Sequence, residues 1–374
     1  MKILYIYNAV ARWGGIERVL ADKVNLLVNM YGYQVFLITT DQGSHSIPFE
    51  MDSRIIHRDL GICFHLQYQY PFLKSLIVRI QKRCQFKRRL LSQLRDIMPD
   101  IIIGSSANFV ADINAVRGNV PFLVESHSGF HHPIEYERLT LVHKLKMRLI
   151  YRNISKATCV VSLTEEDANC WRKVCKTVTI PNIVHLNSTN CYSTCENKRI
   201  IFVGRFASQK GIPDLLAIWK IIHEKYPDWC LDMYGEGEYK ENFQKQIDAL
   251  NANIHVFDPV SNIHQHYIES SIFVLTSVYE PFGLVMVEAM SCGIPVVSFD
   301  CPYGPQSIIT NGKDGFLVKN RSIVDFANRV CKLIENVGLR QEMGYNAMNS
   351  AQRYNAENIM PLWNNLFETI VNGN

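Results

Sequence analysis

The sequence predicts an α/β protein made of two domains, each a parallel sheet covered by helices. Short apolar runs alternate with helical patterns along the chain, as is typical of such sheets. The alternation starts again after residues 187–197, a polar stretch without periodicity. The length of 374 residues is sufficient for two domains that each have a core. Two such sheets, facing each other, would form a central cleft in which ligands bind beyond the carboxyl ends of the strands.

The expected elements follow in order along the chain. The first domain, residues 1–185, should contain strands at residues 3–7, 35–39, 101–104, 120–124 and 158–163. The second domain, residues 196–355, should contain strands at residues 200–204, 231–235, 254–257, 272–276 and 295–299. The final segment, residues 356–374, is amphipathic and carries Trp363 and Phe367. We expect it to form a helix that packs back on the first domain.

Composition and charge restrict the class of protein. Hydrophobic residues make up 47% of the chain, yet no run approaches the roughly 18 apolar residues of a membrane span. The N-terminus begins directly with a strand pattern rather than a signal segment, and the eleven cysteines show no repeated spacing. We therefore expect a cytoplasmic protein with free thiols. Residues 1–180 hold 24 basic and 15 acidic residues, a balance of +9, which favours an anionic partner for the first domain.

Much of that positive charge lies on one predicted helix, residues 74–95. Its apolar residues recur at helical spacing, so the helix is amphipathic. Its predicted contact cations are Arg79, Lys82, Arg83, Lys87, Arg88 and Arg89. This pattern predicts contact with an anionic membrane surface, and a solvated face of an ordinary helix is the alternative. Nucleic acid is not expected, because basic and aromatic residues do not alternate and no known module is present.

The second domain opens with a glycine-bounded loop, Gly204 to Gly211, directly after a strand. Two cations on this short loop, Arg205 and Lys210, suit the clamping of a diphosphate without a metal ion. The loop lacks the Gly-Lys-Ser/Thr ending of nucleotide triphosphatases, so hydrolysis of that kind is not predicted. Solvated loop charges are the alternative interpretation.

Two carboxylates lie eight positions apart across a predicted strand–loop–helix junction. Glu280 stands just before the helix, Pro281 suits its first turn, and Glu288 lies in its second turn. Gly293 suits the cap beyond the helix C-terminus. The helix N-terminus attracts anions, so two acids beside it indicate a place where sugar or ribose hydroxyls are held. The alternative is one capping glutamate and one exposed glutamate.

Two further motifs follow strands of the first domain. Gly14 and Gly15 form a turn that allows the backbone to approach a ligand closely, although a simple tight turn is equally compatible. His127 follows a predicted strand and can hydrogen-bond a hydroxyl or phosphate at the cleft. His131, His132 and Glu135 could join it as metal ligands, but their spacing does not support a metal site.

Taken together, the order and spacing of these motifs resemble the retaining glycosyltransferases of family 4. The resemblance implies the GT-B fold, with two Rossmann-like parallel-sheet domains facing a central cleft. It further implies that the second domain binds a nucleotide-sugar donor and the first an acceptor. The resemblance implies roles for residues named above. Arg205 and Lys210, on the loop that begins at Gly204, would hold the donor diphosphate, and Glu288 would hold the ribose. The transferred sugar would be contacted by Glu280 and by the backbone of Phe282, Gly283 and Leu284. Gly15 would approach the phosphate or acceptor, and His127 would line the reaction centre.

The resemblance also suggests the reaction. Residues 300–305 are similar to a subset that uses UDP-linked hexoses or N-acetylhexosamines in bacterial surface-glycan assembly. A retaining transfer to a glycan or lipid-diphosphate acceptor is expected, without a cofactor or divalent metal, on the cytoplasmic face of the membrane. Attack on the same face as the leaving group and double displacement through a carboxylate both remain open. The other functional alternatives are a nucleotide-sugar epimerase of the same fold and a non-catalytic nucleotide-sugar or glycan-binding protein.

Overall fold

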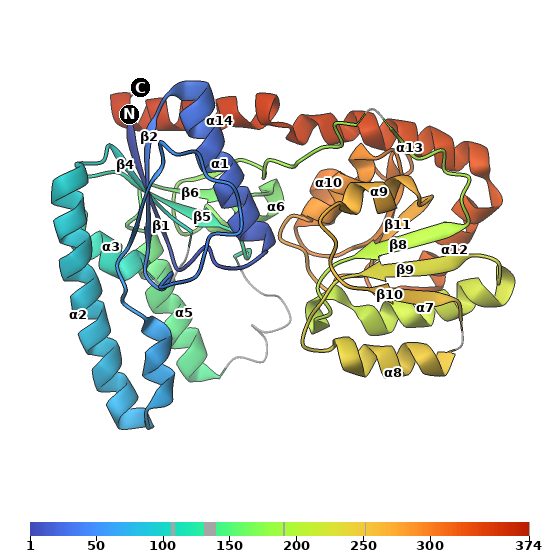
Figure 1. The fold of residues 1–374 in the computed structure, drawn as a ribbon, viewed down its shortest axis with the longest axis horizontal. Helices are drawn as coiled ribbons and strands as arrows, with labels where there is room; N and C mark the ends of the chain where they lie inside the picture. Colours follow the sequence, from blue (N-terminus) through green and yellow to red (C-terminus); the bar gives the residue numbers. More distant parts are fainter. Residues whose placement is uncertain (106–108, 131–139, 190, 251, 374) are drawn as a thin grey trace. The chain divides into compact units, whose positions relative to one another are not determined.

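The structure is a computed structural model that describes residues 1–105, 109–130, 140–189, 191–250 and 252–373. The chain divides into two compact units (Figure 1). Unit 1 comprises Met1–Ile183 and Ile359–Asn374, and unit 2 comprises Val184–Asn358. Each unit contains a parallel sheet with helices packed on it, which confirms the predicted fold class. None of the described helices combines the length and apolar content needed to cross a membrane.

The described residues of unit 1 form a seven-stranded sheet in the order β3-β2-β1-β4-β5-β6-β7, with parallel neighbours throughout. Its strands are β1 Lys2–Tyr7, β2 Gln34–Thr39, β3 Ile56–Asp59, β4 Ile101–Gly104, β5 Phe122–Ser126, β6 Cys159–Ser162 and β7 Thr177–Thr179. Its helices are α1 Gly15–Tyr31, η1 Phe64–Gln69, α2 Phe72–Ile97, α3 Val110–Val116, α5 Leu141–Ile154, α6 Glu165–Trp171 and most of α14 Ala356–Asn372.

The described residues of unit 2 form a six-stranded sheet in the order β10-β9-β8-β11-β12-β13, again with parallel neighbours. Its strands are β8 Arg199–Val203, β9 Cys230–Tyr234, β10 Ile254–Phe257, β11 Ile272–Leu275, β12 Val296–Asp300 and β13 Gly315–Lys319. Its helices are η2 Ser208–Lys210, α7 Ile212–Lys225, α8 Lys240–Leu250, α9 Ile263–Ile268, α10 Leu284–Ser291, α11 Gly304–Ile308, α12 Ile323–Glu335, α13 Val337–Ala351 and η3 Gln352–Tyr354.

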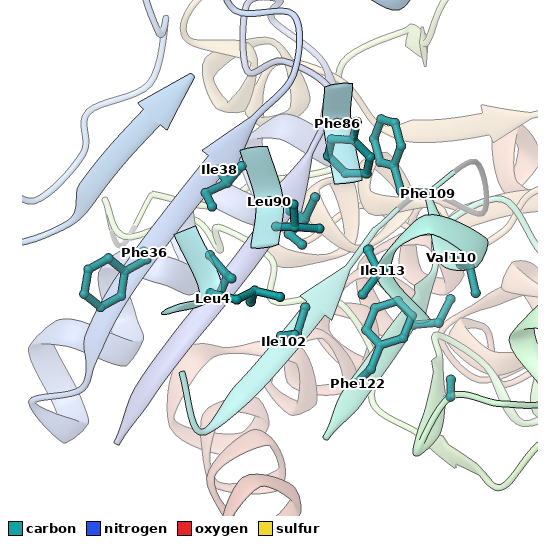
Figure 2. Packing of buried hydrophobic residues seen from close by; sticks show 14 of the residues in the cluster. Leu4, Phe36, Ile38, Phe86, Leu90, Ile102, Phe109, Val110, Ile113 and Phe122 are labelled. Carbon is teal, nitrogen blue, oxygen red and sulfur yellow. The ribbon is translucent and has the colours of Figure 1, made fainter. Parts of the chain in front are cut away.

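The core of unit 1 shows how strand and helix periodicity cooperate. Alternate strand residues such as Leu4 and Ile102 face helix α2, because successive side chains of a strand point to opposite faces (Figure 2). Phe86 and Leu90, one helical turn apart on α2, are fully buried against them. Burying one such side chain contributes about 1.5–3 kcal/mol, so this stripe fixes α2 on the sheet. The helix ends at Ile97 because the following residue is in the left-handed region and Pro99 prevents continuation.

All ten predicted strands are present, but the sequence reasoning missed β3, β7 and β13. Each of the three lies at the edge of its sheet, where a strand needs only one partner and can be short or polar. In β3, for example, Ile56 is the only apolar residue, and it is exposed. The strand predicted at residues 120–124 is β5, which ends at Ser126. Glu125 and Ser126 therefore belong to the strand rather than to the loop after it.

Candidate active site

Three loops of unit 2 meet at one edge of its sheet. They follow β8, β11 and β12, which are parallel neighbours, so their carboxyl ends lie side by side. The loop after β8 contains both predicted cations. Gly211 closes it with a φ of +61°, and a Cβ there would lie 2.1 Å from the carbonyl oxygen of Thr276. Glycine is therefore required, and this close approach holds the cationic loop against the end of β11.

Lys210 and Glu280 are brought together across this edge. The Lys210 Nζ lies 2.6 Å from the Glu280 Oε2, and only 14% and 9% of the two side chains are exposed. The Ser277 hydroxyl donates to the same carboxylate oxygen at 3.0 Å, and the Thr276 hydroxyl donates to the Lys210 carbonyl at 3.0 Å. An ammonium group has three donors, so Lys210 can hold Glu280 and still donate to an anionic ligand.

Arg205, on the same loop, is exposed. Its guanidinium group makes no hydrogen bond or ion pair with another described residue in this state. A planar guanidinium with five unused donors is suited to bidentate contact with a phosphate. The two predicted cations therefore differ: Lys210 is paired with an acid, and Arg205 is free.

The loop after β11 is held by backbone contacts. The amide of Gly304 donates to the carbonyl of Glu280 at 2.7 Å, and a Cβ on Gly304 would lie 1.9 Å from the carbonyl oxygen of Phe282. The Phe282 ring is buried and meets the ring of Tyr354 edge-on, with centroids 5.3 Å apart. This leaves only the backbone of Phe282 as a group that could contact a ligand.

Helix α10 begins later than the sequence predicted. Its first residue is Leu284 and its N-cap is Gly283, which has a φ of +103°. Pro281 therefore lies in the loop before the helix, so its predicted place in the first turn is wrong. A φ in that range belongs to no helical turn, which is why the helix cannot start before Gly283. Gly283 supplies no side-chain cap, although its carbonyl accepts the Met286 amide at 3.0 Å. The amides at the very start of α10 can therefore face an anion.

Glu288 projects from the second turn of α10, as predicted, and is half-buried. The hydroxyl of Tyr267 donates to its Oε2 at 3.4 Å. Gly293 has a φ of +82° and follows the end of the helix, in agreement with the expected cap.

In unit 1, Gly14 and His127 stand at the carboxyl edge of the other sheet. Gly14 is the N-cap of α1, which Gly15 begins, and His127 directly follows β5. His131, His132 and Glu135 lie outside the described residues. The His127 Nε2 is 2.8 Å from the Glu125 Oε2. Because a carboxylate only accepts hydrogen bonds, Nε2 carries a proton and Nδ1 of the neutral ring is left as an acceptor.

Glu125 also pairs with Lys23, which the sequence analysis did not single out. The Lys23 Nζ lies 2.5 Å from the Glu125 Oε1, and both side chains are almost fully buried. The ammonium group also lies 4.2 Å from the centre of the Trp363 ring of α14. A cavity of about 10 Å³ beside these residues is also lined by Val19 and other apolar side chains. Burial alone would raise the pKa of Glu125, but the Lys23 charge and the His127 contacts outweigh it and hold the pKa at about 2.

A signal for Lys23 was present in the sequence. Lys23 lies on the apolar stripe of α1 with Val19, Leu20, Val24 and Leu27, which are all buried. A lysine at such a position requires an acidic partner inside the protein, because an unpaired buried charge is costly. The partner itself, 102 positions away, could not be identified from spacing.

The predicted basic helix α2 is present, but part of its charge is used inside unit 1. Lys82 donates to the carbonyl of Ile62, and Arg89 donates to the carbonyl of Leu60. Arg83 pairs with Asp112 of α3 at 3.1 Å. These three cations therefore have partners inside unit 1, and their contact with a membrane stays a prediction. Of the other predicted cations, Arg79 and Arg88 are exposed and Lys87 is half-buried.

Comparison with known proteins matches both halves of the chain. The family model described as "Glycosyltransferase Family 4" matches residues 13–188, and the model described as "Glycosyl transferases group 1" matches residues 194–350. An uncharacterized glycosyltransferase of Haemophilus influenzae is 29% identical over 97% of this chain and 98% of its own. The amylovoran biosynthesis glycosyltransferase AmsD of Erwinia amylovora is 26% identical over 98% of this chain and 99% of its own.

Solved structures share the fold. A variant of Staphylococcus aureus TarM, solved with fondaparinux, α-GlcNAc-glycerol and UDP, superposes with a TM-score of 0.80 at 18% identity over 98% of this chain and 99% of its own. Anabaena HepE, solved with UDP and glucose, superposes with a TM-score of 0.74 at 18% identity over 98% of this chain and 99% of its own.

Proposed function

Because the chain belongs to the group 1 and family 4 glycosyltransferases, with the GT-B fold, we propose that it transfers a hexose or N-acetylhexosamine from a nucleotide diphosphate sugar, preferably a UDP-sugar. The acceptor is a hydroxyl group of a glycan or of a lipid-linked glycan in bacterial surface polysaccharide assembly. The observation that carries the proposal is the largely buried Lys210–Glu280 pair on the same edge as the free guanidinium group of Arg205.

In the proposed reaction, the bond from the anomeric carbon to the donor diphosphate breaks while a bond to the acceptor oxygen forms on the same face. The acceptor proton passes to the departing phosphate, so the products are a glycoside and a nucleoside diphosphate, with retention at the anomeric carbon. This path requires no protein nucleophile and no divalent metal. The negative charge that develops on the diphosphate is stabilised by Arg205, Lys210, the backbone at Gly204 and the N-terminus of α10.

The remaining site residues hold the two substrates. Glu280 and the backbone of residues 282–284 bind the transferred sugar, and Glu288 binds the ribose hydroxyls, because carboxylates accept hydrogen bonds from vicinal hydroxyls. The backbone of Gly15, with Gly14 beside it, contacts the donor phosphate or the acceptor. The free Nδ1 of His127 accepts a hydrogen bond from a hydroxyl at the reaction centre.

The names and ligands of similar proteins support this choice of substrates. AmsD is named for amylovoran biosynthesis, and TarM was solved with UDP and an N-acetylglucosaminyl glycerol. HepE was solved with UDP and glucose.

A donor screen tests the proposal. UDP- and GDP-linked hexoses and N-acetylhexosamines are incubated with the protein in EDTA, with and without lipid-linked and soluble glycan acceptors, and nucleotide release is measured. We expect release with a UDP-sugar that depends on an acceptor and persists in EDTA. Isomerisation of the donor without an acceptor would instead identify an epimerase. Tight donor binding without turnover would identify a non-catalytic binding protein, and strict metal dependence would contradict the proposed chemistry.

We also propose that unit 1 binds an anionic membrane surface, and that exposed apolar residues at the start of α2 take part in this contact besides cations. The first turns of α2 expose Phe72, Leu73, Leu76, Ile77 and Ile80, between 48% and 83% of each residue. We call these five residues the apolar tip. They recur at intervals of one helical turn and so share one side of the helix. Lys74 and Arg79 lie among them, and together they form the amphipathic pattern of a helix that lies in a membrane interface.

Charged residues in the apolar tip should abolish this binding. We expect the double variant Leu76→Glu, Ile77→Glu to bind vesicles containing phosphatidylglycerol at least about tenfold more weakly, since burial of each side chain contributes about 1 kcal/mol or more. Flotation with vesicles of varied phosphatidylglycerol content measures the effect. The matched control is Val324→Glu, Val337→Glu, which alters two exposed residues of unit 2. Unchanged flotation of the tip variant, or an equal loss in the control, would remove the apolar tip from membrane binding.

A further inference from the structure

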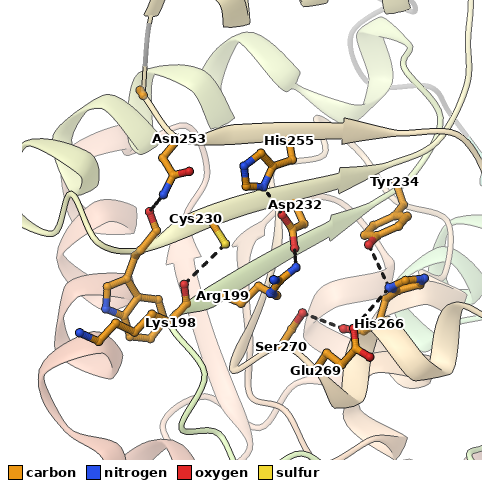
Figure 3. Close-up of polar contacts among 12 residues, drawn as sticks. Lys198, Arg199, Cys230, Asp232, Tyr234, Asn253, His255, His266, Glu269 and Ser270 are labelled. Carbon is orange, nitrogen blue, oxygen red and sulfur yellow. Dashed lines mark hydrogen bonds and ion pairs between the residues drawn. The ribbon is translucent and has the colours of Figure 1, made fainter.

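Three residues with different ligand atoms meet on one face of the unit 2 sheet (Figure 3). Cys230 and Asp232 are two positions apart on β9 and therefore point to the same face. His255 of β10 is the register partner of Asp232. The Cys230 Sγ, an Asp232 carboxylate oxygen and a His255 ring nitrogen all lie within 4.8 Å of one another.

We propose that Cys230, Asp232 and His255 bind a divalent transition-metal ion of the zinc class. A thiolate, an imidazole and a carboxylate are the ligands that Zn²⁺ takes in proteins, and three of them leave the fourth tetrahedral position to water. Bonds of about 2.0–2.3 Å to one ion would place the three ligand atoms about 3.5 Å apart. The observed limit of 4.8 Å exceeds this by little more than 1 Å, which small side-chain rotations can close.

Arg199 of β8 is not a proposed ligand, but it orients the carboxylate of Asp232. Its NH1 lies 2.6 Å from the Asp232 Oδ2, while the Asp232 Oδ1 faces the His255 Nδ1 at 2.8 Å. One carboxylate oxygen is thus held by the arginine, and the other is directed at the proposed ion position. Metal-binding carboxylates are commonly oriented by such an outer hydrogen bond. Asp232 is almost completely buried, whereas 48% of the His255 side chain is exposed, so solvent can reach the cluster.

Metal binding at this cluster balances in protons and charge. The Cys230 thiol loses one proton to solvent. The proton that His255 Nδ1 donates to the Asp232 Oδ1 before metal binding moves to Nε2 by exchange with solvent, so that Nδ1 can bind the ion. Two negative ligands then face one divalent cation.

The cluster is separate from the proposed donor site. Arg199 and Cys230 are the first residues of β8 and β9, at the amino ends of these strands. The loop with Arg205 and Lys210 follows the carboxyl end of β8. The proposed ion therefore takes no part in sugar transfer. The metal-independent reaction proposed above is tested independently of this metal site.

Cobalt and zinc titrations of the full-length reduced protein, first freed of metal with a chelator, test the site. Co²⁺ should produce a sulfur-to-cobalt charge-transfer band with tetrahedral d–d absorption, and Zn²⁺ should displace it at one equivalent. Cys230→Ala should abolish the charge-transfer band, and His255→Ala should weaken Zn²⁺ binding at least about tenfold. Cys84→Ala is the matched control, because Cys84 is an exposed cysteine distant in sequence from the cluster, and it should bind normally.

Several outcomes would overturn the proposal. They are the absence of the charge-transfer band in the wild type, an unchanged band in Cys230→Ala, or an equal loss in Cys84→Ala. Circular dichroism of each variant establishes that the fold is retained. Acceptor-dependent nucleotide release should be the same in Cys230→Ala and the wild type, so a failure of the transfer proposal and a failure of the metal proposal give different results.

Discussion

Replacing Lys210 with methionine is expected to lower kcat/KM for nucleotide-sugar turnover by about 10²–10³-fold, the usual effect of removing one group that stabilises transition-state charge. Methionine preserves much of the lysine stem but cannot donate to the departing diphosphate. It also leaves the Glu280 carboxylate without its ammonium partner 2.6 Å away. Both changes affect the same site. The decrease in kcat/KM should therefore be larger than the decrease caused by replacing an exposed cation.

Steady-state kinetics with the best donor and acceptor measure this effect. Lys210→Arg should recover part of the activity, because a guanidinium group can pair with Glu280 and also contact a phosphate. Lys240→Met is the matched control, since Lys240 pairs with Asp258 on the surface of the same unit. Its activity should stay within about twofold of the wild type. Wild-type turnover in Lys210→Met, with the donor affinity unchanged, would exclude Lys210 from the site.

The variant Lys23→Met is expected to lose about 3–5 kcal/mol of stability, the usual cost of removing one partner of a buried ion pair. Glu125, on β5, would remain buried and, among the described residues, would keep His127 and Ser105 as its side-chain hydrogen-bond partners. Urea unfolding, followed by fluorescence, measures the change. Lys198→Met breaks an ion pair with Asp228 in which more than half of each side chain is exposed, so it should cost less than about 1 kcal/mol. If both variants lost the same free energy of unfolding, the buried Lys23–Glu125 pair would contribute no more to stability than an exposed pair.

Stability should also decline in acid because of Glu125. Its pKa in the folded protein is about 2, below the ordinary value of 4.5. The folded state therefore binds this proton less readily than the unfolded state, and the stabilisation is complete above about pH 5. It should be lost as the pH falls from about 4.5 towards 2. Urea unfolding across this range should show a shallower acid slope for Glu125→Gln than for the wild type.

The sequence predicted the central strands of both sheets because their apolar runs are long and buried. It missed three of the four edge strands, β3, β7 and β13. In β3, for example, the strand is held by backbone pairing and has no apolar pattern. In the candidate site, local motifs singled out Lys210 and Glu280, and the structure places their side chains in contact. Their ion pair, across 70 positions, depends on tertiary structure that no local spacing encodes.

The basic residues of helix α2 are a second case in which contacts in the folded protein could not be predicted from local sequence. Six basic residues of this helix were predicted to form an electrostatic contact surface. In the folded unit, however, a cation that lies within reach of a carbonyl or carboxylate group pairs with it. Arg83 and Asp112 are an example. The exposed apolar tip was visible in the sequence only as part of an amphipathic pattern. The sequence did not show that the sheet covers only the later turns of the helix, which leaves the apolar residues of the first turns exposed.

The path of the chain through the two units has a consequence for the order of folding in the cell. Unit 1 is closed by α14, whose Trp363 covers Lys23, and the α14 residues of unit 1 follow all of unit 2 in the chain. Unit 2 is continuous and lies entirely upstream of Ile359. All residues of unit 2 are therefore synthesised before unit 1 receives its closing helix. A chain that stopped just before Ile359 would contain every residue of unit 2 but would leave residues 1–183 without α14.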